Sequence, residues 1–426
     1  MEVPFKKCDI LIPKKGVNYN LWSVIACDQY TSQPEYWDKV KELVGNNPST
    51  YNIILPEVYL ENEDVEDRIK KINETMNNYL NDDLFETLHD TMIYLERTDS
   101  TGKVREGLIG MIDLDSYDYN VGSKSLVRAT EKTVIERIPP RKKVRVDAPL
   151  ELPHIMILID DEKKEIIESL KNKVTEEDIV YDFDLMMNGG HSKGYKLNDS
   201  AIDEVTKKLE ALGELEYFNN KYGINETAPC VYAMGDGNHS LATAKACYEE
   251  LKEKIGEEAA KNSPARYALV ELVNIHSEAL DFEPIHRVIF DCDVEHLLTK
   301  LYEKFQINTD GNGQKLTYIT SAGEKEIYIE DPTSNLAVGT LQKFLDEYLT
   351  EFAGKIDYIH GDDVTRKMGS EQNNIGFLLP KMEKSDLFKS VILDGALPRK
   401  TFSMGHSDDK RFYLECRKIK IYKDAF

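Results

Sequence analysis

The feature that most constrains the fold is the stretch at residues 231–250, which reads "VYAMGDGNHSLATAKACYEE". It begins as a short apolar run, is interrupted by Gly235 and Gly237, and continues with apolar residues at helical spacing. The apolar run predicts a buried strand, and the spacing after the glycines predicts an amphipathic helix. A strand that passes through a tight turn directly into a helix is typical of chains that alternate strands and helices.

Segments on both sides of this stretch continue the alternation. Four more strands are predicted, at residues 51–60, 90–98, 107–119 and 265–275. Residues 63–80 and 199–215 have helical spacing, the second with Asp199 or Ser200 as its N-cap, and residues 153–173 predict a strand followed by a helix.

A chain of 426 residues is too long for one ordinary core, so two lobes are expected. From about Pro284 the pattern changes to a helix, a hairpin near residues 315–331 and two helix–strand pairs. The predicted fold class is therefore α/β (mixed α+β). Its predicted lobes are residues 1–284, which carry the glycine turn, and residues 285–426.

The composition limits which binding partners and which cellular compartment are expected for the chain. The formal net charge of −23 argues against general nucleic-acid binding, because phosphate backbones would be repelled. No run approaches the ~18 consecutive apolar residues of a membrane span, and the N-terminus lacks the apolar segment of a secretory signal. Six scattered cysteines, with no CxxC pair or zinc-type spacing, predict reduced thiols and a cytoplasmic protein.

Residues 124–145 depart from the acidic balance, with eight basic residues against two acidic ones. The basic residues are Lys124, Arg128, Lys132, Arg137, Arg141, Lys142, Lys143 and Arg145. Most of them are expected to pair with acids elsewhere on the same chain. The alternative is that one or two face a phosphorylated small molecule.

The glycine turn has the chemistry of an anion site. A helix N-terminus carries unpaired N–H groups and partial positive charge, and glycine lets a ligand approach the backbone closely. Asn238 or Ser240 is expected to cap the helix. Asp236 could hold Mg²⁺, and His239, neutral in an empty site, could donate to a bound phosphate from both nitrogens. The alternative is a helix cap beside a buried, satisfied histidine.

These residues also carry a resemblance. "MGDGNHSLATAKA" resembles the signature of the bacterial and archaeal family known as domain of unknown function 1015, whose usual form is D-G-H-H-R. Four shorter pieces are similar to family segments in the same order: "CDQYTSQPEYW", "RATEKT", "LDFEPIHRVIF" and "LPRKTFSMGHS".

The resemblance implies a ParB/sulfiredoxin-like core with a second C-terminal α/β lobe. It also implies kinship with kinases that use ADP or ATP and Mg²⁺ to phosphorylate free L-serine. Carried onto this sequence, Gly237, Asn238, His239 and Ser240 would bind nucleotide phosphates and Asp236 would lie near the metal. Ser240 replaces the usual arginine and Asn238 a usual histidine, so Arg128 or Arg287 is a candidate substitute for the lost cation.

The predicted catalytic residues are Asp28, Asp236 and His239. Asp28 is the candidate base for the acceptor hydroxyl, with Glu131 as the second candidate; an Asx-turn or helix cap is the alternative role for Asp28. Residues 185–197, which are glycine-rich, are interpreted as a surface loop or as a lid over the substrate. Arg287 is alternatively a buried structural residue.

The leading hypothesis is a nucleotide-dependent phosphotransferase that acts on the hydroxyl of a small metabolite, with free L-serine as the first candidate and ATP or ADP with Mg²⁺ as cofactors. The alternatives are a non-catalytic nucleotide sensor and a metal-dependent phosphohydrolase. A small-molecule substrate is expected, nucleic acid and membrane are not, and homo-oligomerisation is left open.

Overall fold

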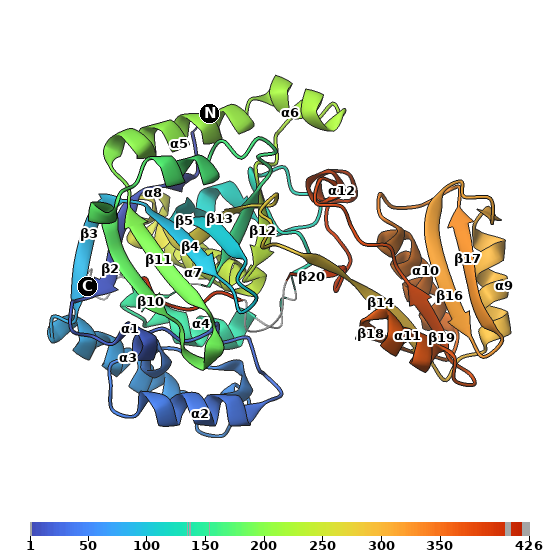
Figure 1. Cartoon of the computed structure of the whole chain (residues 1–426), viewed down its shortest axis with the longest axis horizontal. Coiled ribbons are helices and arrows are strands. Elements are labelled where there is room, and N and C mark those ends of the chain that lie inside the picture. Colours follow the sequence, from blue (N-terminus) through green and yellow to red (C-terminus); the bar gives the residue numbers. More distant parts are fainter. Residues whose placement is uncertain (1, 134, 136–137, 153, 405–409, 420–426) are drawn as a thin grey trace. The chain divides into compact units, whose positions relative to one another are not determined.

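The computed structural model describes residues 2–133, 135, 138–152, 154–404 and 410–419. The chain divides into two compact units, which Figure 1 shows in sequence colours. The first contains residues up to Ala129, then Thr133–Leu280, and also the C-terminal segment at 410–419; the second contains Thr130–Lys132 and the chain from Asp281. The sequence-based boundary at 284/285 instead assigns residues 410–419 to the C-terminal lobe.

The first unit is built on a ten-stranded mixed sheet. In spatial order its strands are β10 (Ile179–Asp184), β11 (His191–Lys196), β4 (Ile93–Thr98), β5 (Val104–Asp113), β13 (Tyr267–Asn274), β9 (Met156–Ile159), β12 (Tyr232–Asp236), β7 (Val127–Arg128) and β6 (Tyr117–Asp118), with β1 (Phe5–Lys6) pairing with β5. Two small two-stranded sheets accompany it, β2 (Cys8–Pro13) with β3 (Phe85–Thr91) and β8 (Leu150–Glu151) with β21 (Arg417–Lys418).

The sheet separates two hydrophobic cores, because successive side chains of a strand point to opposite faces. In β4, Tyr94 belongs to one core while Ile93 and Leu95 belong to the other. In β13, Val270 and Leu269 divide in the same way. The central strands are therefore apolar on both faces, and for this reason they read in the sequence as continuous apolar runs.

Helices cover both faces of this sheet. Those contributing to the first core include α5 (Asp199–Leu212) and α7 (Asn238–Ile255), and those contributing to the second include α1 (Tyr19–Trp22), α2 (Pro34–Val44) and α3 (Val65–Asn81). Figure 1 shows α5 and α2 on opposite sides of the sheet. The remaining helices of the unit are α4 (Ile138–Val146), α6 (Leu215–Tyr222) and α8 (Glu257–Lys261).

The second unit has its own seven-stranded sheet and its own core. The strand order is β15 (Ile307–Asn308), β17 (Gly323–Ile329), β16 (Gln314–Thr320), β19 (Ile375–Leu378), β14 (Phe282–Phe290) and β18 (Lys355–His360), with β20 (Phe402–Met404) pairing with β14. Its helices are α9 (Val294–Lys304), α10 (Ala337–Glu351), α11 (Asp362–Gly369) and α12 (Asp386–Asp394).

The mixed α/β fold expected from the sequence is confirmed, with three local corrections. Residues 51–60 are not a strand but two 3₁₀ turns, Thr50–Ile53 and Glu57–Tyr59. Residues 191–196 are neither lid nor surface loop but the strand β11, paired on both edges. After β9 the chain forms a 3₁₀ turn, Glu168–Asn172, instead of the expected α-helix.

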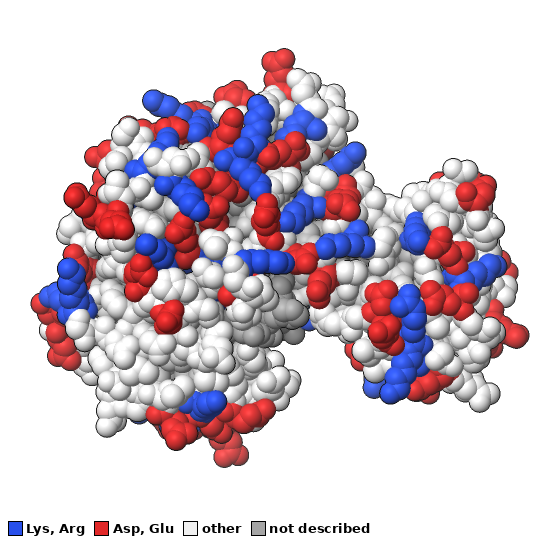
Figure 2. Space-filling model, in the orientation of Figure 1, with Lys and Arg blue, Asp and Glu red and all other residues white. Residues whose placement is uncertain are grey.

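The charged surface residues and the cysteines are arranged as the composition predicts. On the face in Figure 2, basic and acidic side chains are interleaved. All six cysteines are unpaired. Within the described parts of the chain, no helix combines the length and apolarity needed to cross a bilayer.

Candidate functional site

The turn between β12 and α7 is held close to the strand β9. β12 and β9 are antiparallel, with Asp236 opposite Met156, so the end of one strand lies beside the start of the other. Gly237 takes the left-handed conformation (φ +75°), and a Cβ there would come within 3.0 Å of the Ile155 Cα. Two separate constraints therefore require glycine at this position: the left-handed backbone conformation and the close approach of Ile155.

The first turn of α7 differs from the predicted capping. Gly237 itself occupies the N-cap position and no side chain caps the helix, so neither Asn238 nor Ser240 has the expected role. The Gly237 carbonyl accepts hydrogen bonds from the N–H groups of Ser240 and Leu241, at 2.9 and 3.0 Å. The Asn238 amide instead donates to the Thr133 hydroxyl at 3.3 Å.

A buried histidine that the sequence analysis did not single out connects the predicted residues. His154, two residues before the start of β9, is 3% exposed. Its Nε2 lies 3.2 Å from Oδ2 of Asp28, and its Nδ1 lies 2.7 Å from the Tyr413 hydroxyl. Nε2 has no well-aligned hydrogen-bond acceptor among the described residues, so the Asp28 contact is an ion pair rather than a directional bond.

Charge in this cluster stabilises the ionised forms. Burial lowers the pKa of His154, but the negative charges of Asp28 and Asp236 outweigh burial and the net pKa is raised. Burial alone would raise the pKa of Asp28. The positive charges of His154 and Lys410 outweigh burial and hold the pKa of Asp28 well below its usual range. Lys410 Nζ also lies 3.5 Å from Asp236 Oδ2. The site is thus two carboxylates interleaved with two cations.

Asp28 and Lys410 are brought together by the C-terminal segment. The backbone of residues 24–26 pairs with residues 411–413 through three contacts: an isolated bridge between Ile25 and Phe412, and hydrogen bonds of 2.9 and 2.7 Å on either side of it. Because this pairing joins residues almost 390 positions apart, no local signal could have revealed it. A histidine immediately before an apolar run was the only hint of His154 in the sequence.

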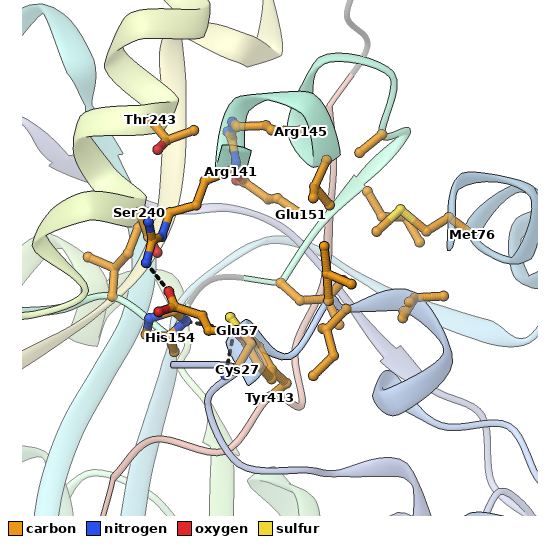
Figure 3. Close-up of a pocket in the computed structure, with 18 of the residues that line it drawn as sticks. Cys27, Glu57, Met76, Arg141, Arg145, Glu151, His154, Ser240, Thr243 and Tyr413 are labelled. Carbon is orange, nitrogen blue, oxygen red and sulfur yellow. Dashed lines mark hydrogen bonds and ion pairs between the residues drawn. The ribbon is translucent and has the colours of Figure 1, made fainter. Parts of the chain in front are cut away.

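A cavity of about 150 Å³ opens beside this cluster. Cys27, His154 and Tyr413 line it together with Ser240 and Thr243 from the first turns of α7. Figure 3 shows Glu57, Arg141, Ser240 and His154 grouped on one side of the pocket and Met76 on the other. Much of the remaining wall is apolar, including Ile53, Ile54, Leu55, Leu60, Val144 and Leu150.

The donors near the turn suit Mg²⁺, the metal that the resemblance implies. Mg²⁺ is ordinarily held by one or two carboxylates together with phosphate oxygens, and Asp236, the predicted metal residue, offers one carboxylate. Asp236 Oδ1 accepts the Gly237 N–H at 2.9 Å, but a carboxylate oxygen has a second lone pair available for a cation.

The two candidate arginines have structural partners. Arg128 is buried and donates to the carbonyl oxygens of Ser125 and Ala228 at 2.8 and 3.2 Å. Arg287, in the second unit, is fully buried and donates to Gln342 Oε1 and to the backbone near residues 399–400. These contacts match the alternative interpretation of Arg287 as a structural residue. Glu131, the second candidate base, also belongs to the second unit.

The basic stretch at residues 124–145 is largely neutralised by acids of the same chain, as expected. Five of its residues form ion pairs: Lys124 with Glu226, Arg141 with Glu57, Lys142 with Glu250, Lys143 with Glu66, and Arg145 with Glu151. Arg137 lies outside the described residues.

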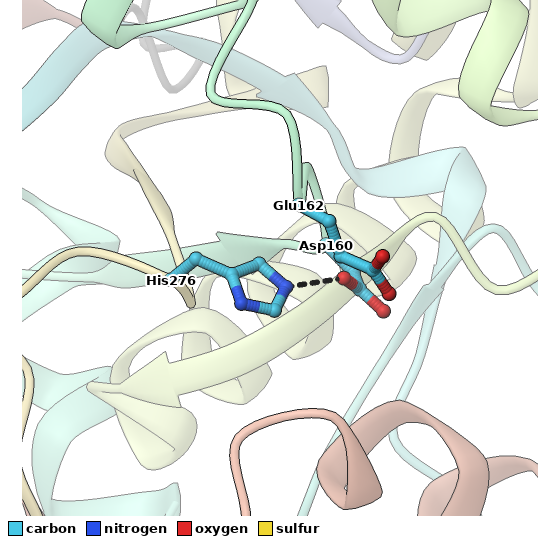
Figure 4. Close-up of side chains that lie close together, drawn as sticks. All are labelled: Asp160, Glu162 and His276. Atoms are coloured by element: carbon cyan, nitrogen blue, oxygen red, sulfur yellow. Dashed lines mark hydrogen bonds and ion pairs between the residues drawn. The ribbon is translucent and has the colours of Figure 1, made fainter.

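Asp160, Glu162 and His276 form a second cluster with metal-like spacing (Figure 4). Asp160 already has close partners, however: His276 Nε2 lies 2.7 Å from its Oδ1, and Lys221 Nζ lies 2.9 Å from the same oxygen. Tyr222 donates to its Oδ2 at 2.6 Å. Three groups of the same unit thus already contact the Asp160 carboxylate, and one of them is an ammonium at hydrogen-bond distance, so we interpret the cluster as a structural ion-pair network.

Several solved structures are similar to this chain. Free serine kinase in complex with AMP is 11% identical with a TM-score of 0.37, and 74% of this chain and 92% of that chain are covered. A conserved hypothetical protein from Pyrococcus furiosus is 12% identical with a TM-score of 0.34, covering 74% and 96%. SbnI from Staphylococcus aureus is 10% identical with a TM-score of 0.35, covering 72% and 82%. At TM-scores this low, the likeness carries no argument about the site.

Sequence comparison is more decisive for the family than for the function. No protein of curated function matches the chain. The family described as "protein of unknown function (DUF1015)" matches residues 11–348, and the chain belongs to this family.

Proposed function

We propose that this protein binds a nucleotide through the β12–α7 turn and transfers a phosphoryl group to the hydroxyl of a small metabolite. The observation that carries the proposal is the gathering of Asp28, His154, Asp236 and Lys410 beside the start of α7. Catalysis of phosphoryl transfer is mainly positioning and charge stabilisation, and this cluster has the residues for both.

Each residue has a distinct role. Asp236 would hold Mg²⁺ together with the phosphate oxygens, and the metal would neutralise phosphate charge when bound. Lys410 and the His154 imidazolium supply the positive charge for which the family usually employs the arginine replaced by Ser240. Asp28, whose side chain is 26% exposed, orients the acceptor hydroxyl and accepts its proton.

The proposed transfer breaks one bond, forms one bond and moves one proton. The bond between the terminal phosphorus and the bridging oxygen of the nucleotide breaks, and a bond from that phosphorus to the acceptor oxygen forms. The acceptor's proton passes to Asp28, and the nucleotide leaves one phosphate shorter. Free L-serine is the first acceptor to test, since it is the substrate that the family resemblance implies.

The test combines binding with turnover. The full chain is incubated with Mg²⁺, ATP or ADP and a pool of amino acids, and phosphorylated products are identified by mass spectrometry. Asp28→Asn is expected to abolish turnover but keep the nucleotide-induced rise in melting temperature. His239→Ala is expected to lose that rise while remaining folded. The matched control is Asp38→Asn, an exposed carboxylate on α2, which should change neither.

The outcomes separate the competing functions. A ligand at 100 times its dissociation constant adds about 2.7 kcal/mol of stability, so nucleotide binding would be readily visible. Binding without product formation would favour a nucleotide sensor, and release of inorganic phosphate without a phosphorylated acceptor would favour a phosphohydrolase. The absence of any shift with millimolar ATP or ADP would refute all three.

A further inference from the structure

We infer that the cavity beside the turn binds the apolar body of the phosphoryl acceptor, so that the preferred acceptor is a hydroxylated amino acid with a benzene-sized side chain rather than serine. This inference rests on the proposed function and adds the substrate class to it.

The size and lining of the cavity favour an apolar occupant. A pocket of about 150 Å³ whose wall is largely aliphatic has room for a benzene ring. Met76 lies on the side away from His154 (Figure 3), and aliphatic residues such as Ile53, Leu55 and Val144 also line the pocket. Serine, whose side chain has a single carbon, would leave this volume unfilled.

The opposite side of the cavity supplies the groups that would recognise a zwitterion. Glu57 and Arg141 form an ion pair there, and each side chain is only 17% exposed. A carboxylate and a guanidinium side by side match the ammonium and the carboxylate of an amino acid. His154 lies on the same side of the pocket (Figure 3), with its Nε2 3.2 Å from Asp28 Oδ2.

The position of the cavity links it to the reacting groups. Cys27 and His154 line it, Asp28 follows Cys27 directly, and Ser240 contributes from the first turn of α7. An amino acid with its apolar body toward Met76 and its head at Glu57 and Arg141 would therefore hold a β-hydroxyl near the charged cluster. The apolar wall then discriminates between acceptors by size.

The test is a series of acceptors with one head group and a growing side chain. L-Serine, L-threonine, 3-hydroxyleucine and 3-phenylserine are titrated calorimetrically into the full chain. Burial of a methylene group contributes ~0.8 kcal/mol, so binding should tighten about fourfold per added methylene. Equal or weaker binding of 3-phenylserine than of serine by the unaltered chain would overturn the inference, whatever any variant does.

Two variants locate the effect in this cavity. Ala148→Phe fills it and should abolish the advantage of 3-phenylserine over serine, while the nucleotide-induced rise in melting temperature is kept. Met76→Ala enlarges it and should favour 3-phenylserine further. An unchanged preference in a folded Ala148→Phe protein would refute the assignment. Binding of 3-phenylserine by a chain that shows no nucleotide shift would instead contradict the proposed function and leave the size preference standing.

Discussion

Replacing Gly237 with alanine tests whether the β12–α7 turn is built as described. The residue is left-handed, at φ +75°, and its missing Cβ would lie 3.0 Å from the Ile155 Cα and 3.4 Å from the Ile155 nitrogen. Both neighbouring atoms are backbone and cannot rotate away. The substitution therefore imposes two penalties, one conformational and one steric.

The magnitude follows from these two terms. A left-handed conformation costs an L-residue roughly 1–2 kcal/mol. Forcing an extra carbon into a filled space typically costs another ~1–3 kcal/mol. Gly237→Ala should thus destabilise the first unit by about 2–5 kcal/mol. The control is Gly223→Ala, because Gly223 is also left-handed, at φ +64°, but a Cβ there would meet no described atom within 4 Å.

The assay exploits the position of the tryptophans. The chain has two, Trp22 and Trp37, and both are fully buried in the first unit. Urea unfolding followed by tryptophan fluorescence therefore reports on the unit that contains the turn. Gly237→Ala should lose ~1–3 kcal/mol more than Gly223→Ala, which pays only the conformational term. Equal losses in the two variants would refute the close approach to Ile155.

Two further predictions concern buried charge. Glu271, fully buried between Arg105 and Arg411 at 3.1 and 3.0 Å, should be essential for stability, and Glu271→Gln should cost about 3–5 kcal/mol in urea unfolding. Glu204→Gln, in a solvent-exposed ion pair with Lys173, is the control and should leave the unfolding midpoint almost unchanged. The Asp28–His154 pair should stabilise most between about pH 4 and 6.5. Its contribution should fall below this window as Asp28, whose pKa is lowered, takes up a proton, and above it as His154, whose pKa is raised, loses one. A flat difference in unfolding free energy between the unaltered chain and an Asp28→Asn/His154→Gln double variant from pH 3 to 9 would contradict the pair.

The strand, turn and helix that carry the site could be predicted from the sequence because consecutive residues determine them. The apolar run, the glycines and the helical spacing of residues 231–250 specify β12, the turn and α7 without reference to any other segment. The same holds for β13, which is apolar on both faces, and for the hairpin of β16 and β17. In each case the periodicity of a few consecutive residues matches the burial observed.

Local pattern failed where burial is arranged by distant contacts. Ile53, Ile54 and Leu55 form an apolar run that resembles a strand. Ile53 instead ends a 3₁₀ turn, Ile54 and Leu55 lie in the loop after it, and all three are buried and line the cavity. The glycines at 189, 190 and 194 predict a surface loop or a lid over residues 185–197. Gly194 is instead needed inside β11, since a Cβ there would lie 2.2 Å from the Tyr181 ring. A glycine that makes room for an aromatic ring is indistinguishable in sequence from one that makes a turn.

The assembly of the charged cluster depends on the same kind of distant contact. Asp236 is placed by its own strand, but His154 reaches it only through the antiparallel register of β9, and Asp28 and Lys410 only through the pairing of residues 24–26 with 411–413. Each ion in the cluster has an opposite charge as its neighbour, and burial of any one alone would be costly. The cluster can therefore exist only when all four segments have docked, which makes the closing of the first unit by residues 410–416 a condition for the site and not merely for stability.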